Sequence, residues 1–336
     1  MSSPAPILEQ PRSESLQRRY DIGIFVPGDP ASHINVEIHW PTTIKPRSQV
    51  LFCVPGGGMN RLYYDLVPDR EEGSESAEFS FAQQMAERGF VSVLVDPPGL
   101  GNSDRPQDSH SLSPELVAGA LARVHSWVCE ELREGKISHD LSAMPDLKSI
   151  GVGHSMGGLL TLLQQDHHKQ HQALVVLGFG IDGLPQFLSA EAKRFAGQPD
   201  ELREHLPRLT KDFFPGNYPV IRGGGGQVDV YGSAGADARA IRALHDANDV
   251  MLPMPAYLGM FPGSVAPECA RLEVPVYLGL GDRDMLLPPE DPKAIFPASP
   301  AITVNVLPET GHSHFLFASR TQLFDGIAQW VDTINI

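Results

Sequence analysis

Cysteine is scarce in this sequence of 336 residues, which has three: Cys53, Cys129 and Cys269. An odd number of widely spaced cysteines does not suggest a disulfide framework, so we expect reduced thiols in a cytoplasmic protein. The first residues, MSSPAPILEQPRSES, lack the basic start and the apolar run of a secretion signal. No stretch approaches the ~20 apolar residues that a membrane span requires, so none is expected.

Basic residues are also fewer than acidic ones. Lysine and arginine number 26 against 41 aspartates and glutamates, which gives a formal net charge of −15. An acidic surface repels nucleic acid and anionic membranes, so neither is expected as a partner. The glycine runs at 56–58 and 223–226 lack the frames of phosphate- or dinucleotide-binding loops, and we expect no cofactor. His167 and His171 have a metal-like spacing, but their place at a predicted helix end favours interaction with the helix dipole, and no metal is expected.

Short apolar segments alternate with helical patterns along the chain. The strand candidates are the segment around Ile150 and Val152 and residues 50–54, 90–95, 173–177, 274–280 and 302–307. This alternation predicts an α/β fold, in which a mostly parallel central sheet has helices on both faces. An antiparallel hairpin of residues 20–26 and 34–40 is expected at the edge of the sheet.

The same rhythm suggests how the chain is divided. Residues 1–19 are rich in proline, serine and charge, and we expect a flexible segment there. Residues 20–180 and 273–336 carry the alternating pattern and form the predicted core domain. Residues 181–272 break the pattern with frequent prolines and glycines, and their helical candidates are 201–213 and 236–250. We expect this stretch to be a helical insertion.

The pentapeptide Gly153-His154-Ser155-Met156-Gly157 lies between a strand pattern and a helix pattern. A chain that turns directly from strand to helix strains its central residue, and glycine is needed where a Cβ would meet neighbouring backbone. The Ser155 hydroxyl is then exposed beside the helix N-terminus, and His154 is expected to face the core with a hydrogen bond. The pentapeptide resembles the nucleophile elbow of the α/β-hydrolase family, some of whose members carry a cap or lid at the position of residues 181–272.

The resemblance implies a catalytic acid and a catalytic base after the serine, in that order. The run Gly281-Asp282-Arg283-Asp284 is similar to the Gly-x-x-Asp of the family's acid loop and selects Asp284. Asp282, and Asp182 after the preceding strand, are alternatives, and a solvated loop aspartate is the non-functional reading. Gly311-His312 precedes the last helix, which makes His312 the expected base and His314 its rival.

The resemblance also implies two backbone N–H donors for an oxyanion. One should belong to Met156, the residue after the nucleophile. The other should come from the run Pro55-Gly56-Gly57-Gly58, with Gly57 favoured over Gly58. Family members often have His-Gly where this chain has Pro55, a departure that main-chain donors tolerate. An ordinary glycine-rich turn is the alternative for this run.

Together these motifs imply a serine hydrolase that cleaves a carboxylic ester or lactone of a small, largely apolar substrate. Thioester or carbon–carbon bond hydrolysis on the same fold is the alternative, and a non-catalytic ligand-binding protein is a further one. Met254, Tyr257 and Met260 are candidate substrate-binding residues in the insertion, or plain core of a cap. The oligomeric state stays open, a homodimer included.

Overall fold

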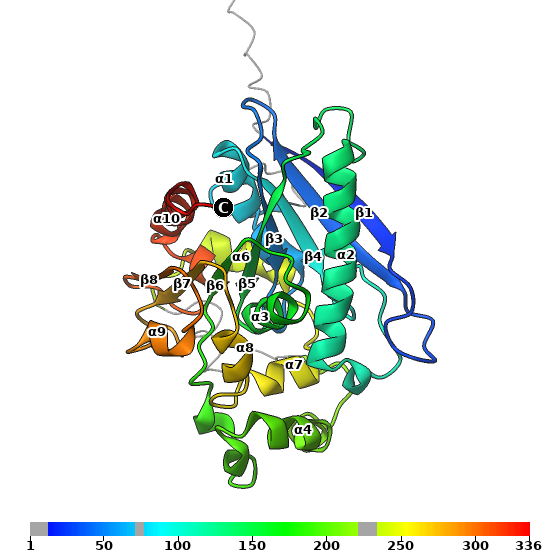
Figure 1. Ribbon diagram of the computed structural model, residues 1–336, viewed down its shortest axis with the longest axis vertical. Coiled ribbons are helices and arrows are strands. Elements are labelled where there is room, and N and C mark those ends of the chain that lie inside the picture. Colours follow the sequence, from blue (N-terminus) through cyan, green and yellow to red (C-terminus); the bar gives the residue numbers. More distant parts are fainter. Residues whose placement is uncertain (1–12, 71–76, 221–233) are drawn as a thin grey trace, which may run out of the picture.

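The computed structural model describes residues 13–70, 77–220 and 234–336. Within these ranges eight strands form one sheet in the order β1-β2-β4-β3-β5-β6-β7-β8 (Figure 1). β1 pairs antiparallel with β2 and β2 with β4, whereas the other neighbours are parallel, so the predicted mostly parallel sheet is confirmed. The strands are β1 Ser13–Asp21, β2 His33–Pro41, β3 Gln49–Val54, β4 Val91–Asp96, β5 Lys148–His154, β6 Ala173–Leu177, β7 Val276–Gly281 and β8 Ile302–Leu307.

Helices cover both faces of this sheet, as expected (Figure 1). Because side chains alternate along a strand, β3 contributes to two separate apolar cores. Phe52 and Val54 join the core that contains α2 and α3, and Leu51 and Cys53 join the core that contains α1 and α10. The helices are α1 Phe81–Glu87, α2 Pro114–Glu134, α3 Met156–His168, α4 Pro199–Phe213, α6 Ala238–Ala247, α7 Pro253–Leu258, α8 Ala266–Ala270, α9 Pro292–Ile295 and α10 Arg320–Thr333.

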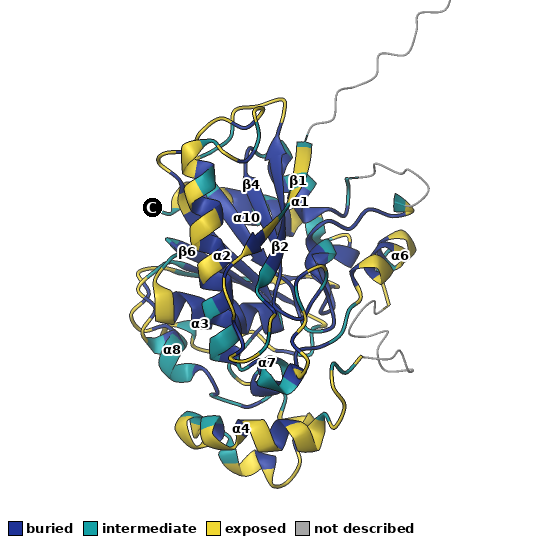
Figure 2. Cartoon of the chain, turned by 90° about the vertical axis from the view of Figure 1, so that its right-hand side faces the viewer, coloured by how far each residue is buried: buried dark blue, intermediate teal, exposed yellow. Residues whose placement is uncertain are grey.

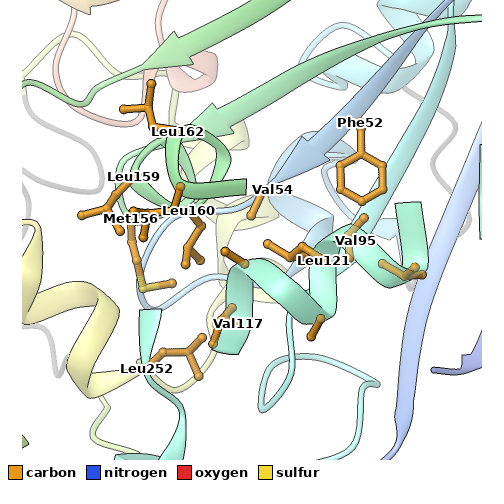
Figure 3. Close-up of a cluster of buried hydrophobic side chains, with 14 of the residues drawn as sticks. Phe52, Val54, Val95, Val117, Leu121, Met156, Leu159, Leu160, Leu162 and Leu252 are labelled. Carbon is orange, nitrogen blue, oxygen red and sulfur yellow. The ribbon is translucent and has the colours of Figure 1, made fainter. Parts of the chain in front are cut away.

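The core around α3 fixes the part of the sheet where the pentapeptide lies. Val117 and Leu121 of α2 pack with Leu159 and Leu160 of α3 and with the end of β3 (Figure 3). All of these side chains are fully buried or nearly so, and close packing of this kind leaves little freedom for the start of α3. The helix therefore holds a defined position relative to the carboxyl ends of β3 and β5.

The edge of the sheet differs from its prediction. The antiparallel pair is present, but its first strand is β1, Ser13–Asp21, and not residues 20–26. Residues 13–19, expected to be flexible, are paired with β2 throughout this strand. Backbone hydrogen bonds define an edge strand, so its exposed side chains carry little of the apolar signal on which the prediction relied. Residues 1–12 lie outside the described residues.

The stretch between β6 and β7 contains α4, α6, α7 and α8, and helices are present at both predicted positions. α4 lies at one end of the molecule with a largely exposed outer face (Figure 2). α7 and α8 instead contact α3 and lie close to the sheet core. In the part of the chain that is described, no helix is both long and apolar enough to traverse a bilayer.

Candidate active site

The tight turn at Ser155 joins β5 directly to α3. Ser155 has φ 52° and ψ −120°, a strained conformation for a residue with a side chain. A Cβ on Gly153 would lie 2.3 Å from the carbonyl oxygen of Gly157, and one on Gly157 would lie 2.1 Å from that of Val54. Both positions therefore require glycine, as the sequence suggested. The turn places the Ser155 side chain at the carboxyl end of β5, in a cavity of about 280 Å³.

The structure brings Ser155, His312 and Asp284 together. His312 Nε2 lies 2.9 Å from Ser155 Oγ, and His312 Nδ1 lies 2.8 Å from Asp284 Oδ1. The serine follows β5, the aspartate follows β7 and the histidine follows β8, so three loops at the carboxyl ends of parallel strands converge. With its proton on Nδ1, the imidazole donates to the carboxylate and can accept the serine proton at Nε2.

Asp284 is the carboxylate that faces His312. Burial alone would raise the pKa of Asp284, but its interactions with His312 and His314 hold that pKa well below its ordinary value. The two alternatives lie elsewhere. Asp282 is exposed and accepts a hydrogen bond of 3.0 Å from the Thr310 backbone, and Asp182 is exposed in the loop after β6.

Two further histidines surround this group. His314, the rival base, contacts the other oxygen of the carboxylate, with 3.3 Å from its Nε2 to Asp284 Oδ2. His154 is fully buried, as expected, and donates from Nε2 to the His312 carbonyl oxygen at 2.9 Å. Burial, with His312 and His314 beside it, lowers the pKa of His154 well below its ordinary value, so His154 is neutral. Of these three histidines, His312 is the one that hydrogen-bonds the Ser155 hydroxyl.

The expected oxyanion donors are not equivalent in the structure. Gly57 and Met156 both line the cavity beside Ser155. Among the described residues, neither of their N–H groups donates a backbone hydrogen bond in a loop or cap, so both are available to a ligand. Gly58 does not line the cavity, and its carbonyl oxygen accepts from Asp249 N at 2.8 Å. Gly57 is therefore the better placed of the two glycines.

Of the three substrate-binding residues predicted in the insertion, two do not line the cavity. Met260 lines the cavity, whereas Met254 and Tyr257 do not. The Tyr257 ring stacks on Phe213, with 4.6 Å between ring centroids, and Met254 is buried in the apolar core. Met254 and Tyr257 lie on α7, whose cavity-lining residue is Ala256, whereas Met260 follows the end of that helix.

Most of the cavity wall was not anticipated from sequence. Five of the nine methionines of the chain contribute to it, and two of these five, Met156 and Met260, were among the predicted site residues. Met251 and Met260 are close in sequence, but Met59, Met156 and Met285 come from distant positions, and the sequence does not show that they meet. The other residues of the wall are mainly apolar, and those that were not among the predicted site residues include Met59, Phe179, Leu184, Phe187, Phe213, Met251, Met285 and Leu286.

One group of potential metal ligands lies outside the cavity. Within the described ranges, Glu37, His39 and Asp65 place three ligand atoms within 4.8 Å of one another. Arg61 pairs with Glu37 at 3.1 Å and Arg70 with Asp65 at 2.8 Å, so the carboxylates are already neutralised by cations. His167 and His171 are not part of this group, and His171 hydrogen-bonds Ser149.

The chain matches a known protein family in sequence and several solved structures in fold. A model described as "Alpha/beta hydrolase family" matches residues 50–324, whereas no curated protein matches the chain. An esterase from M. tuberculosis is 18% identical over 97% of this chain and 94% of its own, with TM-score 0.56. A monoacylglycerol lipase from Paleococcus ferrophilus is 16% identical over 95% and 98%, with TM-score 0.56. A thioesterase domain from the curacin biosynthetic pathway is 15% identical over 96% and 100%, with TM-score 0.55. At these identities the solved structures show a shared fold.

Proposed function

This chain belongs to the alpha/beta hydrolase family, and on that premise we propose that it is a serine hydrolase that cleaves a carboxylic ester or lactone. The observation that carries the proposal is the continuous contact from Ser155 through His312 to Asp284, with separations of 2.9 and 2.8 Å. Such a series of hydrogen bonds converts an ordinary hydroxyl into a nucleophile, because the histidine removes the hydroxyl proton during attack.

The proposed reaction passes through an acyl-enzyme. Ser155 Oγ attacks the substrate carbonyl carbon while His312 Nε2 takes the hydroxyl proton. The N–H groups of Gly57 and Met156 stabilise the negative oxygen, and each such donor is typically worth about 3–4 kcal/mol. His312 then protonates the leaving alcohol, and a water molecule, deprotonated by His312, releases the acid. Asp284 fixes the tautomer of His312 and stabilises the imidazolium.

The cavity supports a small, largely apolar substrate. Methionines are adaptable and polarizable, so a wall rich in them accommodates flexible apolar groups of different shape. Among the described residues, the wall has two titratable side chains, His312 and His154, and His154 is neutral. A charged acyl group would therefore find no counter-ion in the wall.

We further propose that residues 181–272 form a cap over a core of residues 20–180 and 273–336. Phe187, Phe213 and Met260 of this stretch line the cavity, which supports a role in substrate selection. The three cysteines are free and buried, which supports the proposal of a reducing, cytoplasmic location.

A substrate panel tests the proposal. Esters, lactones and thioesters of graded chain length are assayed with the wild type, with Ser155→Ala, and with Ser126→Ala, an exposed serine on α2, as the matched control. We expect Ser155→Ala to fold and to lose turnover on every substrate, including p-nitrophenyl acetate, while Ser126→Ala keeps it. Wild-type turnover by Ser155→Ala would overturn the proposal, and a clear preference for thioesters would change the substrate class. Ligand binding by the natural protein without turnover on any substrate would favour the non-catalytic alternative.

A further inference from the structure

The carboxylate of Asp284 has two histidine partners, one on each oxygen. Oδ1 lies 2.8 Å from His312 Nδ1, and Oδ2 lies 3.3 Å from His314 Nε2. The side chains of Asp284 and His314 are both completely buried. The proposed mechanism uses the first contact and gives no role to the second.

His314 can serve this carboxylate as a neutral donor. Burial lowers the pKa of His314, although Asp284 opposes that shift, so the imidazole is neutral at ordinary pH and carries one N–H. Because Nε2 faces a carboxylate oxygen, which can only accept, the proton must be on Nε2. His314 Nδ1 has no hydrogen-bond partner among the described residues, which agrees with an unprotonated nitrogen.

The orientation of a carboxylate is otherwise weakly defined. Rotation about its last torsion is soft, with no sharp preferred angle. The Leu286 N–H also donates to Asp284, at 3.3 Å, but to Oδ1, the oxygen that already faces His312. Bonds to one oxygen leave the group free to pivot, whereas a bond to the other oxygen holds the plane of the carboxylate.

A tight turn makes this two-point contact possible. His314 N donates to the His312 carbonyl oxygen at 3.1 Å, so the chain reverses locally and both imidazoles reach the same carboxylate. His154 Nε2 also donates to that carbonyl oxygen, at 2.9 Å, and its ring packs edge-on against His314, with 5.6 Å between centroids. The loop after β7 and the loop after β8 are thereby joined at two points.

We propose that His314 is a positioning residue, which holds the Asp284 carboxylate so that Oδ1 faces His312 throughout the reaction. The proposal rests on the proposed serine hydrolase function. His314 acts through Asp284 and does not contact the reacting atoms. Loss of its N–H would leave Oδ2 buried without that donor, and the carboxylate would turn or draw in water to satisfy it.

Substitutions at position 314 test this role in the full-length protein with p-nitrophenyl acetate as substrate. His314→Leu removes the donor, and we expect kcat to fall about tenfold to a hundredfold with KM nearly unchanged, the range found for hydrogen-bond partners that orient metal-binding side chains. His314→Gln carries an amide nitrogen at the same position along the side chain as Nε2 and should restore most of the rate. His314→Asn is polar but too short to reach Oδ2, so it should resemble His314→Leu and replaces it if that variant does not fold.

A double-mutant cycle with Asp284→Asn separates positioning from structural support. If His314 acts through Asp284, then His314→Leu should cost nothing further in kcat once Asp284 is replaced. His171→Gln, which removes a buried histidine bonded to Ser149 away from the cavity, is the matched control and should keep the wild-type kcat.

The outcomes distinguish this inference from the proposed function. If Ser155→Ala abolishes turnover while His314→Leu keeps the wild-type kcat, the role of His314 is wrong and the hydrolase mechanism stands. Equal losses in His314→Gln and His314→Leu, or additive losses in the cycle, would also overturn it. If Ser155→Ala keeps turnover, the proposed function itself fails.

Discussion

The substitution Gly157→Ala links the packing of the elbow to its chemistry. The added Cβ would lie 2.1 Å from the Val54 carbonyl oxygen and 2.5 Å from that of Pro55, whereas real Cβ contacts are essentially never shorter than 3.0 Å. Both obstacles are backbone atoms and cannot rotate away. The start of α3 and the end of β3 would therefore have to separate by nearly 1 Å.

This displacement falls between the two proposed oxyanion donors. Pro55 leads into the loop that carries Gly57, and Met156 directly precedes Gly157 in the chain. Overpacking of this kind typically costs about 1–3 kcal/mol of stability. Loss of one oxyanion donor typically costs ~3–4 kcal/mol of transition-state stabilisation, so we expect kcat to fall about a hundredfold to a thousandfold.

The assay combines kcat for p-nitrophenyl acetate with the free energy of unfolding from urea titration. Gly119→Ala on α2 is the matched control, because its Cβ would meet nothing nearer than His168 Nε2 at 3.9 Å. We expect the control to gain about 0.5–1 kcal/mol of stability and to keep its kcat. A folded Gly157→Ala protein with wild-type kcat would refute the reasoning about the elbow.

Two further predictions concern titratable groups. Asp284→Asn should lower kcat by about 10⁴-fold, because the amide favours the wrong tautomer of His312, and a near-normal rate would move the acid's role to Asp182 or Asp282. Burial, with a smaller effect of Arg133, lowers the pKa of His125 to about 3, against about 6.5 in an unfolded chain. The stability that this neutral histidine confers is present above pH 6.5 and lost as the pH falls toward 3. Between pH 6 and pH 4, the unfolding free energy of the wild type should therefore fall by about 1.3 kcal/mol more per pH unit than that of His125→Gln, and equal slopes in urea titrations would contradict the assignment.

The sheet centre was predictable because parallel strands buried on both faces read as continuous apolar runs. Residues 50–54 and 173–177 are of this kind, and each lies in a strand. Ser155, Asp284 and His312 could be named because each lies after a predicted strand in a motif that resembles one of the α/β-hydrolase family. The edge strand β1 was misplaced because its polar side chains say little about backbone pairing.

The cavity wall could not be predicted because it depends on how helices pack in space. Tyr257 faces Phe213 of α4 and not the cavity, an outcome decided by the docking of α4 against α7. The second contact of Asp284 is of the same kind. His314 could be identified as a histidine near the base, but its bond to Oδ2 exists only because the turn after β8 brings both imidazoles to one carboxylate.

The central claim, that Ser155 is an activated nucleophile, is tested most directly by covalent labelling. The protein is incubated with a fluorophosphonate, and the adduct is measured by intact mass and located by peptide mapping. We predict one adduct per chain, on Ser155, and a greatly slowed reaction in His312→Ala. An adduct on another residue, or an unlabelled protein that still hydrolyses esters, would contradict the account.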